Sequence, residues 1–169
     1  MNVENAIRYK KTAYTFCNIY AYDFCYLCEV FLPRVWWSES ALISLSNGGQ
    51  VDIRYGETVF EIRANELFQW LKEFGSSFGW RRVFTAQELQ TAADQGYVGV
   101  VVANTKNHDN SGHICVVVPQ TDVHTPVTME GEIVTPVMSD AGLSNHEYYS
   151  YRWWTKDKYS FFGFWINDN

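Results

Sequence analysis

The chain lacks a long apolar run, a basic stretch and a secretory signal, and each absence excludes a class of protein. No apolar run reaches about 18 residues without a polar interruption, so no membrane-spanning helix is predicted. Basic residues occur in pairs such as Lys10-Lys11, and the net charge is −6, so the clustered basic surface of a nucleic-acid-binding protein is not expected. The first residues lack the apolar core of a secretory signal. We therefore expect a protein that is made in the cytoplasm without a signal peptide.

Aromatic and apolar residues are abundant by contrast. The 169 residues include 7 Trp, 11 Tyr and 11 Phe, and 47% are hydrophobic, which excludes a disordered chain. The sequence has no internal repeat, low-complexity tract or evident linker, and it is long enough to bury a substantial core. These features predict one domain spanning residues 1–169, and we expect it to be a monomer.

Residues 13–37 form the most informative segment, because they place a thiol at the start of an apolar helix. Residues that mark one apolar helical face recur at three- and four-residue steps: Cys17, Ala21, Phe24, Cys25, Cys28 and Leu32. Thr15 is the predicted N-cap, and Pro33 ends the predicted helix. A helix that is apolar nearly all round is normally buried. Cys17 would thus lie in the first turn, where the helix dipole favours the thiolate.

A histidine whose sequence context is typical of a catalytic base lies far along the chain from Cys17. His113 begins the strand-like run HICVVVP after a polar loop, residues 104–112. A cysteine at a helix N-terminus and a histidine on a distant strand are the arrangement of thiol hydrolases. The two residues therefore form a candidate catalytic pair.

These motifs resemble those of a known family. The order T-x-C-N followed by Asp23 at a helix start, then G-H-I-x-V-V-x-P on a strand, resembles the papain-like bacterial cell-wall amidases and endopeptidases of the cysteine/histidine-dependent amidohydrolase superfamily. Residues 64–71 and 95–102 look like the helix and strand that lie between the two motifs in that group. The resemblance covers roughly residues 12–142. It implies hydrolysis of an amide bond in the peptide stem of peptidoglycan, with Cys17 as nucleophile and His113 as base.

The resemblance also implies a third polar residue that orients the histidine, on the strand after the histidine strand. That strand is predicted within residues 131–141, so Asp140 is the first candidate. His124 is the alternative, because its separation from His113 is near the spacing that some relatives use, although it lies among turn-forming residues. A carboxylate at this position would fix the tautomer and hold the ring.

Further residues are candidates for binding the substrate. The backbone amide of Cys17 is expected to meet the oxyanion, and Tyr14 is a candidate side-chain donor just upstream. Asn18 follows the family pattern and is expected mainly to shape the helix and its neighbours. Paired tryptophans are candidates for lining a groove for sugar or peptide: Trp36-Trp37 and Trp153-Trp154.

The four cysteines leave a second interpretation open. Cys25 and Cys28, together with Cys115 and His113, could be assembled into a structural zinc site. The simpler interpretation is that these three cysteines are small buried hydrophobic residues. A disulfide framework is not expected, because three of the four cysteines lie on one predicted helix. We expect no cofactor and no metal.

Predicted helices come first in the chain and predicted strands later. The helices cover residues 17–32, 38–45, 65–74 and 85–94, and the strands cover 97–103, 113–119, 133–139 and 159–166. Residues 51–55 and 58–63 are ambiguous. This order predicts an α+β fold of the papain-like type, with a small antiparallel sheet packed on N-terminal helices.

The missing signal and the single domain fit a toxin injected between bacteria, such as a type VI secretion amidase effector. Such a toxin acts on peptidoglycan in the periplasm of a target cell and is normally matched by an immunity protein. A phage lysis enzyme of the same chemistry is the alternative. Two other hypotheses are a non-catalytic binding module that keeps the fold and a zinc-stabilised interaction domain.

Overall fold

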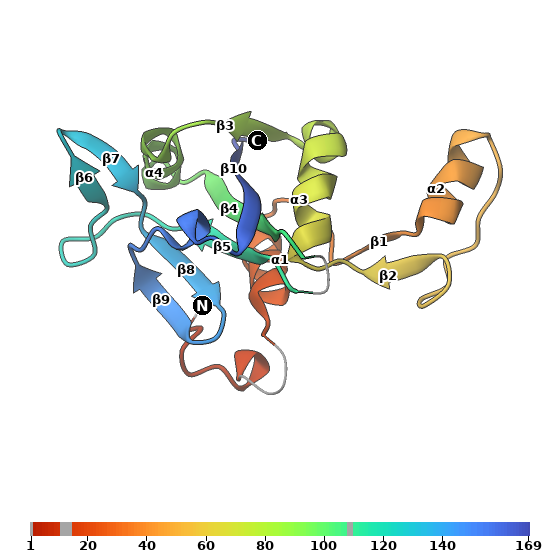
Figure 1. Ribbon diagram of the computed structural model, residues 1–169, viewed down its shortest axis with the longest axis horizontal. Coiled ribbons are helices and arrows are strands. Elements are labelled where there is room, and N and C mark those ends of the chain that lie inside the picture. The colour runs from red at the N-terminus through yellow and green to blue at the C-terminus, as the bar shows by residue number, and fades with distance from the viewer. Residues whose placement is uncertain (1, 11–14, 108–109) are drawn as a thin grey trace.

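An antiparallel sheet of six strands forms the centre of the computed structural model, which describes residues 2–10, 15–107 and 110–169 (Figure 1). The spatial order of the strands is β3-β10-β4-β5-β8-β9. In chain order their bounds are β3 Trp80–Val83, β4 Val98–Thr105, β5 His113–Val117, β8 Met138–Ala141, β9 Asn145–Tyr149 and β10 Tyr159–Asn167. With the helices described next, the sheet gives the α+β class that the sequence predicted.

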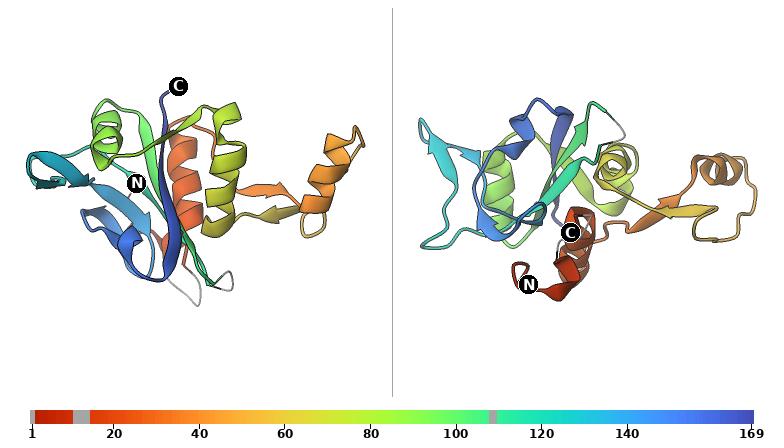
Figure 2. Two further views of the ribbon diagram at one scale, coloured as in Figure 1. Left: turned by 45° about the horizontal axis from the view of Figure 1, so that its top comes forward. Right: turned by 60° about the horizontal axis from the view of Figure 1, so that its bottom comes forward.

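Helices cover both faces of this sheet (Figure 2). Helices α1 (Cys17–Leu27) and α3 (Ala64–Glu73) pack on one face, and α4 (Ala86–Asp94) with the 3-10 helix η3 (Trp153–Thr155) packs on the other. The alternation along β4 follows: Val100 and Val102 belong to the first core, and Val101 and Ala103 to the second. Because both faces are covered, β4 is buried along its whole length.

An arm extends from this body, and we define it as residues 35–61 (Figure 1). It consists of the two-stranded ribbon of β1 (Val35–Trp37) and β2 (Val59–Glu61), with helix α2 (Glu39–Ser46) at its far end. The Ser38 side chain accepts a hydrogen bond from the Ala41 amide at 3.3 Å and so caps this helix. The ribbon resolves the ambiguity of residues 58–63.

The remaining elements are short. They are η1 (Ile7–Tyr9), η2 (Gly75–Phe78) and the hairpin of β6 (Val127–Met129) with β7 (Glu132–Thr135). The N-terminal segment is held to α1 by Arg8, whose Nε lies 2.6 Å from Asp23 Oδ2, and by the Tyr9 hydroxyl, which donates to the same carboxylate at 2.7 Å. Asp23 therefore supports the helix, as the sequence predicted. None of the helices in the described segments is long and apolar enough to cross a membrane.

The predicted start of the first helix at Cys17 is confirmed, whereas its predicted cap and its predicted end were wrong. Helix α1 ends at Leu27 rather than near Pro33, because the chain turns at Glu29, which has a left-handed φ of 59°. Its N-cap is Phe16, without a side-chain capping bond, rather than Thr15. The last turn of the helix is also exposed, with Leu27 at the surface, so the helix is not buried all round.

The other predicted helices are confirmed, and so are three of the four predicted strands, as β4, β5 and β10, whereas the fourth needed correction. The capping box of Thr85 and Glu88 opens α4, and α3 lies within one residue of its predicted bounds. The strand predicted over 133–139 is two strands, β7 and β8, separated at Pro136, which has no backbone N–H to donate. Strands β3 and β9 were not predicted.

Candidate active site

Three polar side chains from three different elements meet at one end of the sheet. Cys17 is the first residue of α1, His113 the first of β5, and Asp140 lies on β8, which pairs with β5. The Nε2 atom of His113 lies 2.5 Å from Oδ2 of Asp140. The Asp140 residue is only 5% exposed, so its carboxylate is directed at the histidine from within the protein.

The thiol of Cys17 lies on the other side of the histidine ring. The thiol is close enough to His113 for the imidazole to lower its pKa, and Cys17 is 3% exposed. Because Nε2 is engaged by Asp140, the nitrogen left for the thiol is Nδ1. The start of α1 is fixed to β8 as well, since the Phe16 amide donates to the Ala141 carbonyl at 3.1 Å. One backbone contact therefore joins the elements that carry the first and third residues of the set.

The loop before β5 determines where the histidine lies. A Cβ atom at Gly112 would collide with the Ala103 carbonyl and with the Asn65 side chain, so a glycine is required at this close approach. Asn65, at the start of α3, also donates to the Asn110 carbonyl at 2.9 Å and accepts from the Thr105 amide at 3.1 Å. The glycine of the G-H motif therefore lets the loop pack against β4 and α3.

The electrostatics of the pair favour the charged forms of both side chains. Burial raises the pKa of Cys17, but the hydrogen bond and positive charge of His113, together with the Ile114 amide, outweigh it and bring the pKa below its usual value. Burial lowers the pKa of His113, but hydrogen bonds to Asp140 and Cys17 outweigh it and raise the pKa to about 9. These interactions therefore favour a thiolate beside an imidazolium.

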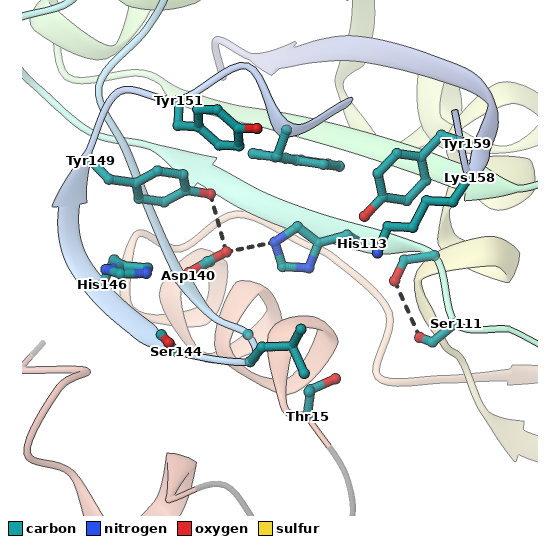
Figure 3. A pocket seen from close by; sticks show the side chains of 14 residues that line it. Thr15, Ser111, His113, Asp140, Ser144, His146, Tyr149, Tyr151, Lys158 and Tyr159 are labelled. Atoms are coloured by element: carbon teal, nitrogen blue, oxygen red, sulfur yellow. Dashed lines mark hydrogen bonds and ion pairs between the residues drawn. The ribbon is translucent and has the colours of Figure 1, made fainter. Parts of the chain in front are cut away.

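Two aromatic residues complete the surroundings of the histidine and its carboxylate. The Tyr149 hydroxyl donates to Asp140 Oδ2 at 3.1 Å, so this one oxygen accepts two hydrogen bonds (Figure 3). Burial raises the pKa of Tyr149 well above its usual value, so the hydroxyl keeps the proton that it donates. The Trp153 ring packs edge-on against the His113 ring, with centroids 4.5 Å apart. Carboxylate and imidazole are thus both held from the side of β9 and η3.

Two cavities flank the pair, and they share Thr15 and Ser111. The cavity on the side of His113, which we call the histidine-side cavity, has a volume of about 570 Å³ (Figure 3). Its side walls come from residues near the C-terminal strands, and the largest of them are His146, Tyr149, Tyr151, Trp153, Lys158 and Tyr159.

The cavity on the side of Cys17, which we call the arm-side cavity, has a volume of about 630 Å³ and is bounded by the base of the arm. Tyr55 and Phe60 line it with rings that are 70% and 47% exposed. Asn18 also lines it and donates to the Ile62 carbonyl at 3.0 Å, which fastens the base of the arm to α1. The thiol therefore opens onto a surface that the arm contributes.

Some residues considered from the sequence lie away from this site. His124 lies in a turn, stacked on Tyr148 with ring centroids 4.3 Å apart and hydrogen-bonded to Thr121, so the structure does not bring it to His113. Trp36 is packed in an aromatic cluster with Trp70, and neither it nor Trp37 lines the two cavities. The groove prediction for the Trp36-Trp37 pair was therefore wrong. Tyr14 lies outside the described residues.

The zinc interpretation does not fit the geometry. Cys25 lies in the core on one face of the sheet and Cys115 in the core on the other face, while Cys28 is exposed. Within residues 2–10, 15–107 and 110–169, no three His, Cys, Asp or Glu side chains gather in a way that could hold a metal ion. Cys25 and Cys115 are the small buried residues that the simpler interpretation predicted, and Cys28 is the exception.

Several residues that line the site were not predicted from the sequence. Tyr149, Lys158 and Tyr159 carry no local signal for a site, because they reach the histidine only through the order of strands in the sheet. Trp153 was considered as half of a tryptophan pair, but only Trp153 lines the cavity, while Trp154 packs in the core beneath.

The site as a whole is a cysteine–histidine–aspartate constellation at the open end of an antiparallel sheet, with the thiol at a helix N-terminus. Comparisons with protein-family models, with curated proteins and with solved structures found no match to the chain.

Proposed function

We propose that the protein is a papain-like cysteine hydrolase that cleaves an amide bond in the peptide stem of peptidoglycan. The observation that carries the proposal is the position of His113, which is hydrogen-bonded to Asp140 and lowers the pKa of the Cys17 thiol. This is the geometry in which a nucleophile, a base and an orienting group act together. The reaction class is supported by this geometry, and the substrate class by the resemblance of the sequence motifs.

The geometry leads to a mechanism in two stages. The Cys17 thiolate attacks the carbonyl carbon of the amide, and the C–S bond forms as His113 gives its Nδ1 proton to the nitrogen, so that the C–N bond breaks and the amine leaves. Water then attacks the thioester while His113 takes up a proton from that water. The carboxylic acid is released, and the thiolate–imidazolium pair of the free enzyme is restored. The Cys17 amide, in the first turn of α1, is free of intrahelical bonding and can donate to the oxyanion.

The biological setting that fits this chemistry is a toxin delivered to the periplasm of a target bacterium, with an immunity protein that blocks the cleft in the producing cell. A phage lysis enzyme would use the same reaction. The two settings differ in a simple observation, because only the toxin requires a neighbouring protein that inhibits it.

The test is digestion of purified sacculi by the wild type, Cys17→Ala and His113→Ala, with mass spectrometry of the released muropeptides. We expect the wild type to release fragments with one new amine and one new carboxylate. Both variants should release none, although their melting temperatures should show that they are folded like the wild type. His124→Ala is the matched histidine control and should digest normally. Full activity in the Cys17 or His113 variant would disprove the mechanism.

A further inference from the structure

The two cavities beside the Cys17–His113 pair receive different parts of a substrate. In the proposed reaction, His113 gives its proton to the departing amine, so the amine side of the amide must lie on the side of His113. His113 lines the histidine-side cavity, and Cys17 lines the arm-side cavity. The geometry therefore assigns the leaving amine to the histidine-side cavity and the acyl group to the arm-side cavity.

A single permanent positive charge faces the histidine-side cavity. Among the described residues that line it, Lys158 is the only lysine or arginine. Its Nζ lies 4.7 Å from the centroid of the Tyr159 ring, and its carbonyl accepts a hydrogen bond from the Lys106 amide at 3.1 Å, so the backbone at this point is anchored next to β4. Figure 3 shows the Lys158 side chain extending from the β10 side into the cavity.

Lys158 is not paired with a carboxylate within the described residues. Arg8, Arg54 and Arg81 each form an ion pair, whereas none is found for Lys158 or for the other lysines and arginines in the described part of the chain. The protein carries a net charge of −6, so acidic side chains that could pair with a lysine are not scarce. The ammonium group is therefore available to an anion that enters the cavity.

The charges around the reacting atoms show what that ammonium group would do. The Cys17 thiolate, the His113 imidazolium and the Asp140 carboxylate together carry one negative charge. A carboxylate on a substrate would be repelled by this set if no further cation were present. Lys158 offsets the negative charge on the side where the amine leaves.

We propose that Lys158 binds a free carboxylate on the amine side of the scissile bond, so that the enzyme prefers a leaving group that is an amino acid with an ionised carboxyl group over the same amino acid as its carboxamide. This specificity rests on the proposed hydrolase function. It concerns selection between substrates and leaves the bond-breaking step to Cys17 and His113.

The test uses two synthetic peptides that span the bond identified from the digested sacculi. They are identical except that the residue on the amine side carries either a carboxylate or a carboxamide. A charge-assisted contact of this kind corresponds to a preference of about tenfold in kcat/KM for the carboxylate. In Lys158→Met that preference should disappear, and in Lys158→Glu it should reverse.

Lys156→Met is the matched control. Lys156 lies two residues away, is exposed and also lies over a tyrosine ring, at 5.1 Å from the Tyr151 centroid, but it does not line the cavity. This variant should keep the wild-type preference, and in the wild type the preference should shrink as salt is added.

The outcomes separate the two proposals. Equal hydrolysis of both peptides by the wild type, or an unchanged preference in Lys158→Met, overturns the role of Lys158 and leaves the hydrolase function standing. Failure of the wild type to digest any sacculus overturns the hydrolase function, and the specificity with it.

Discussion

The histidine-side cavity and the arm-side cavity together form one cleft, and its two walls are built in different ways. The wall that holds His113 belongs to the central sheet, and its residues come from β5, β8 and β9 with support from η3. The wall opposite belongs to the arm, where Phe60 lies on β2 and Tyr55 lies before this strand in the chain, and both side chains are exposed. The difference indicates that groups requiring accurate placement are fixed in the buried body, whereas the arm supplies contact surface whose shape can vary without disturbing the chemistry. Each prediction below tests this division.

The largest effect is expected from the body wall. Asp140→Asn keeps the shape of the side chain but removes the charge that stabilises the imidazolium, so turnover should fall roughly ten- to a thousandfold. His124→Ala, far from His113, should leave turnover unchanged. The measurement is kcat on a peptide substrate for both variants, and a critical His124 with a silent Asp140 would mean that the orienting residue has been wrongly assigned.

A smaller effect is expected from the arm wall. Ser38 and Thr58 face each other across the ribbon, with the Ser38 amide donating to the Thr58 carbonyl at 2.8 Å. Replacing residues 39–57 by Asn-Gly should close the ribbon as a two-residue hairpin and remove α2 and Tyr55. We expect kcat/KM to fall about tenfold, because Tyr55 no longer contacts the acyl group.

The pH dependence of Cys17 alkylation and of turnover should distinguish the two walls more sharply. The thiolate forms as pH rises through the lowered pKa of Cys17, so alkylation by iodoacetamide should persist to a lower pH than for an ordinary cysteine. Above about pH 9, His113 loses its proton and turnover should decline about tenfold per pH unit, because the leaving amine is no longer protonated. Asp140→Asn should raise the Cys17 pKa, since the imidazolium beside it is less favoured.

Removing the arm should leave that alkylation profile unchanged, because no charged group of the arm lowers the Cys17 pKa. The experiment is best done in a Cys28→Ser background, since Cys28 is the exposed thiol and burial raises its pKa. A profile that shifts when the arm is removed would show that the two walls are electrostatically coupled.

The smallest effects concern stability. Cys25 is a fully buried residue of α1, so Cys25→Ala should lower the free energy of unfolding by about 1–2 kcal/mol. Ile43→Ala on the arm and Cys28→Ala at the exposed end of α1 should each change it by less than about 0.5 kcal/mol. Denaturant titration of the three variants measures this, and an equal loss at Ile43 would show that the arm is a packed part of the body.

The sequence predicted those parts of the site that local signals define. Cys17 was identifiable because a thiol precedes an apolar helical face, and His113 because a glycine and a polar loop precede a valine-rich strand. Asp140 followed from the order of motifs in the resembled family. The early end of α1 was not predictable from periodicity, since the apolar pattern continues to Leu32, which is buried although it lies beyond the helix.

The rest depended on tertiary arrangement. Tyr149 and Lys158 reach the site only because β9 pairs with β8 and because β10 lies between β3 and β4. The two strands of the arm were not predicted, because they have three residues each, too few for an alternating pattern to be visible. Trp36 looked like a groove residue, but packing against Trp70 decides its position.

The place of β10 has a consequence for biosynthesis. It follows every other strand in the chain, yet it occupies the interior of the sheet, hydrogen-bonded to β3 and β4. Until the ribosome has released residues 159–167, β4 has one unpaired edge, and its sequence VGVVVANT carries no charge that would oppose association with another nascent chain. A partly synthesised chain that has already formed β4 would therefore be prone to aggregation, and a chain that stops before Lys158 lacks both the interior strand and one wall of the histidine-side cavity.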